Sequence, residues 1–152
     1  CMFCPLQEKC VAYNEGSIDK LPVKLKKLKV KQRYFNFFVF ITQDERTIIE
    51  KREGKGIWQN LYQFPLIETD KEIDETQAIK FTKSFSFISN IDFELSLYNT
   101  KPILHKLSHQ HLNTKFWIVT VDGNMENTVP INEIETYPVP ILIGDFIEAF
   151  NF

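Results

Sequence analysis

The stretch YFNFFVFIT (Tyr34–Thr42) decides the fold of this chain, because it gathers the aromatic and β-branched side chains that favour strands into one short run. It is followed by the polar residues QDE (43–45) and by a second β-rich run, RTIIEK (46–51). Two such runs joined by a short polar connection are typical of a hairpin. We therefore expect residues 34–51 to open a β-sheet.

The rest of the chain predicts further strands and two helices. Strands are expected over residues 93–98, 103–107 and 115–121. The clearest helical pattern lies between Asp74 and Phe85, where Asp74 suits the N-cap. A second helix is expected over residues 141–150. One helix within a run of strands, with another at the end, predicts an α+β fold.

Length and composition indicate one globular domain preceded by a short leader. The chain has 152 residues, of which 43% are hydrophobic, which is enough for a sizeable core. No apolar run approaches the ~18 residues that a membrane span needs, so no membrane partner is expected. An odd number of cysteines without a signal-peptide pattern argues against a secreted disulfide scaffold. A reducing compartment, and hence a cytoplasmic location, is the expectation.

Positive charge is concentrated in one segment. The net charge of the whole chain is −2, yet residues 20–33 carry seven basic side chains and no acidic one, whereas the part from residue 34 onward has a net charge of −7. Each phosphate contact releases counterions, so a few engaged cations would hold duplex DNA without reading its sequence. A solvated linker is the plainer alternative. The expected phosphate contacts are Lys24, Lys26, Lys27, Lys29, Lys31 and Arg33.

All three cysteines, Cys1, Cys4 and Cys10, lie at the start of the chain. Unrelated thiols, a zinc half-site and a redox pair are possible interpretations, but zinc would need an awkward five-residue spacing and redox pairs normally sit in a thioredoxin-like unit. An iron–sulfur ligand set fits the spacing best. A four-iron cluster needs four thiolates, so a fourth ligand is expected upstream of Cys1.

The cysteine run also carries a family resemblance. Cys1-x2-Cys4-Pro5-Leu6-x3-Cys10 resembles the last three ligands of the C-x6-C-x2-C-x5-C cluster loop of helix-hairpin-helix DNA glycosylases, most closely the A/G-specific adenine glycosylases (MutY). Three more landmarks follow in the family's order: Leu21-Pro22-Val23-Lys24, Trp58-x2-Leu61-x2-Phe64-Pro65 and Leu107-Ser108-His109. Together the four landmarks span the chain and make the resemblance specific.

This resemblance implies three parts: residues 1–19 as the tail of the iron–sulfur loop, 20–33 as a basic interdomain connector, and 34–152 as a Nudix-like lesion-recognition domain with a mixed sheet, one main helix and a C-terminal helix. The parent enzyme would remove adenine paired with 8-oxoguanine in double-stranded DNA. Catalysis would belong to its N-terminal glycosylase domain. We therefore assign no catalytic residue and expect this chain alone to be inactive and without the 4Fe-4S cluster.

The same resemblance implies that Leu107, Ser108 and His109 bind the lesion. Oxidation at C8 turns guanine N7 from an acceptor into an N–H donor, which a small hydroxyl such as that of Ser108 can recognise. His109 can donate to the 8-oxo oxygen or to a phosphate. Leu107 stands where the family often has Phe, and it gives up base stacking worth ~1–3 kcal/mol.

Two alternatives belong to other functional classes. A free-standing Nudix-type hydrolase of oxidised nucleotides needs the G-x5-E-x7-R-E-x2-E-E box, whose carboxylates hold magnesium. The predicted helix has Glu72, Asp74 and Glu75 near its start, where acids are favoured by the helix dipole, but no Arg-Glu or Glu-Glu pair. A non-enzymatic interaction module is the other alternative.

The histidines and the aromatic residues receive structural interpretations. His105, His109 and His111 would share one face of a continuous strand and could form a metal triad, but the Leu107-Ser108-His109 match predicts a break in that strand, so surface histidines are favoured. Trp58 and Phe64 are assigned to packing, as are the phenylalanines of residues 34–42.

Overall fold

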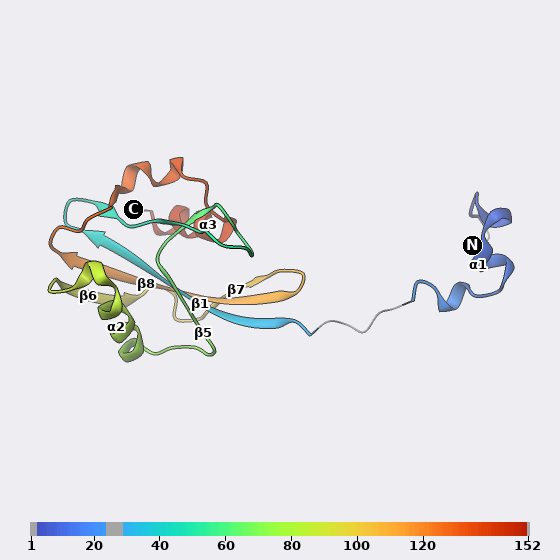
Figure 1. The fold of residues 1–152 in the computed structure, drawn as a ribbon, viewed down its shortest axis with the longest axis horizontal. Coiled ribbons are helices and arrows are strands. Elements are labelled where there is room, and N and C mark those ends of the chain that lie inside the picture. Colours follow the sequence, from blue (N-terminus) through green and yellow to red (C-terminus); the bar gives the residue numbers. More distant parts are fainter. Residues whose placement is uncertain (1–2, 24–28, 152) are drawn as a thin grey trace.

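The computed structural model of the chain describes residues 3–23 and 29–151, and its main feature is one mixed five-stranded sheet (Figure 1). The strand order is β5-β1-β8-β6, and β7 also pairs with β8. These strands are β1 (Lys31–Thr42), β5 (Leu66–Thr69), β6 (Asp92–Leu97), β7 (Ile103–Lys106) and β8 (Gln110–Asp122). With the helices described below, this sheet confirms the predicted α+β class.

Strands β1 and β8 form the centre of the sheet. They run parallel along their whole length, from the pair Lys31↔Gln110 to the pair Thr42↔Val121. The other edge of β1 pairs with β5, and β8 pairs with β7 over its first half and with β6 over its second half. Strand β1 therefore starts at Lys31, ahead of the predicted start at residue 34.

The predicted hairpin of residues 34–51 is wrong in its pairing. The turn is present, with Glu45 N donating to Thr42 O at 3.2 Å. The following run, however, divides into short strands that pair elsewhere. Strand β2 (Arg46–Thr47) pairs with β9 (Val129–Pro130), and β3 (Glu50–Lys51) pairs with β4 (Tyr62–Gln63).

The aromatic run of β1 builds a core on both faces of the sheet, as its alternation requires. Phe35 and Phe37 face helix α3 (Ile141–Phe150), whereas Phe38 and Phe40 face helix α2 (Glu75–Ser84). The two helices cover opposite faces (Figure 1). All four phenylalanines are fully buried, which confirms their assignment to packing, and each contributes about 1.5–3 kcal/mol by burial.

Both predicted helices are present. Asp74 caps α2 as expected: its carboxylate accepts from Gln77 N at 2.8 Å while the Gln77 side chain accepts from Asp74 N at 3.2 Å, which makes a complete capping box. Helix α3 has the predicted bounds. It is anchored by Phe146, whose ring stacks on Phe116 with centroids 4.1 Å apart.

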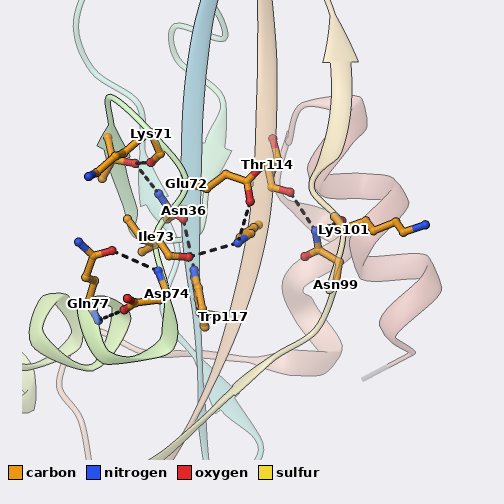
Figure 2. A network of polar contacts seen from close by, with 12 residues as sticks. Asn36, Lys71, Glu72, Ile73, Asp74, Gln77, Asn99, Lys101, Thr114 and Trp117 are labelled. Atoms are coloured by element: carbon orange, nitrogen blue, oxygen red, sulfur yellow. Dashed lines mark hydrogen bonds and ion pairs between the residues drawn. The ribbon is translucent and has the colours of Figure 1, made fainter.

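A side chain completes the ladder where β8 changes its partner from β6 to β7. Asn99 Nδ2 donates to the carbonyl oxygens of Lys101 and Thr114, both at 2.9 Å; Figure 2 shows the bond to Thr114. Its Oδ1 accepts from Phe116 N at 2.8 Å. Asn99 therefore hydrogen-bonds two backbone groups of β8 at the point where the partner strand changes.

The remaining elements are short. They are η1 (Gln7–Lys9), α1 (Val11–Asn14), η2 (Ile18–Lys20), η3 (Ser86–Ile88) and η4 (Ile131–Thr136). Within residues 3–23 and 29–151, every helix is too short or too polar to cross a membrane.

Candidate functional site

The three residues expected to bind the lesion form the turn between β7 and β8, which we call the 107–109 turn. Leu107 N donates to Gln110 O at 2.8 Å and closes it. Leu107 is half-buried and packs against the α3-side core, while Ser108 and His109 are exposed. The predicted break in the strand is therefore present, and the leucine anchors a turn that presents two polar side chains to solvent.

This break separates the histidines. His105 pairs with Leu112 on the face that α3 covers, and its ring lies 5.9 Å from the Trp58 ring. His111 lies on the opposite face, where its Nδ1 is 3.3 Å from the Gln32 side-chain nitrogen. Among the residues described, no three His, Cys, Asp or Glu side chains are grouped to hold a metal. The three histidines thus lie apart, with His109 exposed and His105 and His111 half-buried.

The end of the basic segment lies directly beside the 107–109 turn. Lys31 N donates to His109 O at 3.0 Å, so β1 begins where the turn ends. The side chains of Lys29 and Lys31 are exposed there. The other three lysines expected to contact phosphate, Lys24, Lys26 and Lys27, lie outside the described residues.

Arg33, in contrast, is engaged within the protein. Its Nε and Nη2 donate to the two carboxylate oxygens of Glu68, both at 2.6 Å, and its Nη1 donates to Gln110 Oε1 at 2.9 Å. The hydrogen bond with Arg33 lowers the pKa of Glu68, and the same bond raises the pKa of Arg33. This bidentate pair ties β1 to β5 and β8 next to the turn.

The acids expected at the start of α2 have structural roles. Asp74 caps the helix, and Glu72 pairs with Lys115 at 3.3 Å (Figure 2). The Lys115 ammonium also donates to Ile73 O at 3.2 Å and lies 6.0 Å from the Trp117 ring centroid. Beside it, the Trp117 indole N–H donates to the buried Asn36 at 3.3 Å. These polar groups fasten α2 to the sheet.

The cysteines have the donor chemistry that an iron–sulfur cluster needs, but the sequence holds three of them and not four. Cys4 is exposed and Cys10 is half-buried at the start of α1, and both are free thiols. Cys1 lies outside the described residues. Soft thiolates fit iron, and the three cysteines of the sequence would fill three of the four positions that such a cluster requires.

A cavity of about 860 Å³ opens between the end of α3 and residues 130–135. Ile41, Asp44 and Ile147 are among its lining residues. Among the described residues, none of the side chains expected to bind DNA lines it, so the exposed turn, rather than this cavity, is the candidate site.

Two residues near the turn, Arg52 and Trp58, have surroundings that the sequence does not indicate. Trp58 was assigned to packing, and it does pack against the α3-side core, but it is only half-buried and adopts a left-handed backbone with φ of 60°. Arg52 carried no motif and was not singled out. The Gly-Lys-Gly stretch between them was the one available signal of an unusual loop.

Comparison with known proteins identifies the family to which this fold belongs. The family model described as NUDIX domain matches residues 36–149. The solution structure of the E. coli ORF135 protein superposes with a TM-score of 0.53 over 80% of this chain and 89% of that one, at 15% sequence identity, which shows a shared fold. The chain therefore belongs to the NUDIX domain family.

Within this family, the similarity is to adenine DNA glycosylases. The protein of that name from Buchnera aphidicola subsp. Schizaphis graminum is 32% identical over 72% of this chain, and that from Buchnera aphidicola subsp. Baizongia pistaciae is 26% identical over 78%. The resemblance inferred from the sequence landmarks is thus confirmed. The chain spans only 28% and 31% of the length of these two relatives.

Proposed function

We propose that this chain is the lesion-recognition part of an adenine DNA glycosylase and that the 107–109 turn reads 8-oxoguanine opposite the adenine. The observation that carries the proposal is the position of the turn: Ser108 and His109 are exposed at the end of the sheet, and the backbone of Lys31 is bonded to that of His109. A lesion reader and a phosphate-binding segment thus adjoin.

Each part of the site has a separate task in this proposal. The Ser108 hydroxyl accepts a hydrogen bond from the N7–H of the lesion, which unmodified guanine lacks, and His109 donates to the 8-oxo oxygen or a neighbouring phosphate. Leu107 holds the turn to the core. Arg33, already bound to Glu68 and Gln110, orients the start of β1. The lysines of the basic segment, Lys24, Lys26, Lys27, Lys29 and Lys31, contact phosphates.

The proposal extends to the parent protein. Adenine excision would take place in an N-terminal glycosylase domain, with the adenine flipped out of the duplex. Cys1, Cys4 and Cys10 would supply three ligands of a 4Fe-4S cluster there. This chain alone would neither excise adenine nor hydrolyse nucleotides, and the parent would act in the cytoplasm.

The test compares the affinities of the intact parent protein for duplexes with 8-oxoguanine·adenine and guanine·adenine at one fixed salt concentration. Ser108→Ala combined with His109→Ala should collapse the ratio of the two affinities while leaving general DNA binding in place. Ser89→Ala, in an exposed turn before β6, is the matched control and should leave the ratio unchanged. An unchanged ratio in the double variant would overturn the proposal.

Two further results would point to the other functional classes. Magnesium-dependent release of phosphate or pyrophosphate from a nucleoside triphosphate would favour a Nudix-type hydrolase. Equal, weak binding of every duplex would favour an interaction module without a role in DNA recognition. Either result contradicts the assignment of the 107–109 turn.

A further inference from the structure

Two guanidinium groups and the Trp58 ring lie around the buried ring of Phe35 on the α3 side of the sheet, and His105 lies beside Trp58. The Cζ atoms of Arg33 and Arg52 lie 4.7 Å and 5.8 Å from the Phe35 ring centroid. Trp58 packs edge-on against the same ring at 6.1 Å, and His105 lies 5.9 Å from Trp58. Because His105 belongs to β7, the cluster reaches the strand that leads into the 107–109 turn.

The two arginines of this cluster differ in how their charge is balanced. Arg33 is neutralised by Glu68. Arg52 donates to an uncharged partner, Gln63 Oε1, at 3.1 Å. Within residues 3–23 and 29–151 the ion pairs are Arg33–Glu68 and Lys115–Glu72, so Arg52 has no carboxylate in contact. Burial lowers the pKa of Arg52 and the neighbouring Arg33 lowers it further, while the charge of Glu68 acts in the opposite direction. An anion in contact with Arg52 would favour its charged form.

The loop that follows Arg52 is fixed rather than loose. Arg52 N donates to Leu61 O and Asn60 N donates to Arg52 O, both at 2.8 Å, so the loop is closed at its base. Trp58 and Asn60 hold φ values of 60° and 67°. A bulky residue in this left-handed region costs of order 1–3 kcal/mol, which the surrounding contacts must offset. With this backbone, the Trp58 ring contacts both the Phe35 ring and the His105 ring of β7.

We propose that Arg52 binds a backbone phosphate of the DNA beside the lesion and that Trp58 is a positioning residue for the 107–109 turn. A guanidinium has a planar fork of donors that suits a phosphate. The guanidinium of Arg52 lies over the Phe35 ring. The site lies on the same face of the sheet as His105, next to the strand that begins the turn. This inference rests on the proposed function, because it takes DNA as the ligand.

Salt-dependent binding by the intact parent protein tests the role of Arg52. One phosphate contact contributes ~0.9 to the slope of log affinity against log salt concentration, so Arg52→Gln should lower that slope by about one. The affinity at fixed salt should fall about tenfold, and by the same factor for duplexes with and without 8-oxoguanine. Lys80→Gln, which removes an exposed charge from α2 on the opposite face, is the matched control and should change the slope less.

Two further measurements keep the test decisive if Arg52→Gln folds poorly. Arg52→Lys keeps the charge and should retain the slope. In the unaltered protein, single methylphosphonates placed on either side of 8-oxoguanine should reveal one position where removing the phosphate charge weakens binding about tenfold. If no position does so, or if Arg52→Gln keeps the full slope, the phosphate contact is refuted. The lesion ratio of the Ser108 and His109 variants is measured separately, so failure of Arg52 leaves the proposed function standing.

Discussion

Replacing Phe146 with alanine should destabilise this domain more than any change on the outer surface of α3. The Phe146 ring is 3% exposed and stacks on Phe116 at 4.1 Å. It also meets Phe64 at 5.6 Å, Tyr98 at 5.1 Å and Phe150 at 5.3 Å. Phe→Ala in a packed core costs ~3–5 kcal/mol. Because four rings lose a partner, each worth ~0.5–1.5 kcal/mol beyond burial, we expect the upper half of that range.

Urea unfolding of the 152-residue chain, followed by tryptophan fluorescence and by circular dichroism, measures this loss. Phe146→Ala should lower the free energy of unfolding by about 4 kcal/mol, a large part of the ~5–15 kcal/mol that holds a domain together. Ile141→Ala, in the same helix but with a side chain 68% exposed, should cost under about 1 kcal/mol. Equal effects of the two substitutions would refute the packing of α3 described here.

Three more expectations concern the polar groups and the cysteines. Asn99→Ala leaves two backbone groups of β8 without their partner, so it should cost ~2–4 kcal/mol in urea unfolding, and a loss below ~1 kcal/mol would contradict this. Arg33 lowers the pKa of Glu68, so the stabilisation by Glu68 is present above the unfolded-state pKa of ~4.3 and is lost as the pH falls through the folded-state pKa. The difference in unfolding free energy between the unaltered chain and Glu68→Gln should therefore shrink from pH 7 to pH 3. A constant difference would refute this. The purified 152-residue chain should lack a strong visible absorption from a 4Fe-4S cluster, since three thiolates are one short, and such a band would contradict the expectation.

The aromatic run and the helix caps could be predicted from the sequence because local physics determines them. The run of residues 34–42 is aromatic enough to predict a buried strand, whose alternation places its phenylalanines on both faces, and Asp74 predicts the start of α2. The partner of β1 could not be predicted, because pairing with β8 brings together residues more than seventy positions apart and no local signal announces it. The hairpin prediction therefore found the turn and missed the pairing.

The candidate site, too, could be predicted only in part from the sequence. The 107–109 turn was found because its tripeptide is a motif, and its place between two strands agrees with the expected break. The closeness of Lys31 to His109 depends on the long-range register of β1 and β8. The packing of Trp58 could be predicted, but the contacts of Arg52 and Trp58 with Phe35 and the left-handed backbone of Trp58 could not, because the sequence displays neither.

The most direct test of the central claim asks whether the Ser108 hydroxyl recognises the N7–H of the lesion. The intact parent protein and its Ser108→Ala variant would be titrated, at one salt concentration, with duplexes that carry 8-oxoguanine or 8-methoxyguanine opposite adenine. The second base keeps an oxygen on C8 but has no N7–H. If the hydroxyl reads that proton, Ser108→Ala should weaken binding to 8-oxoguanine about fivefold and leave binding to 8-methoxyguanine unchanged. Equal losses with both bases would show that Ser108 does not recognise the lesion.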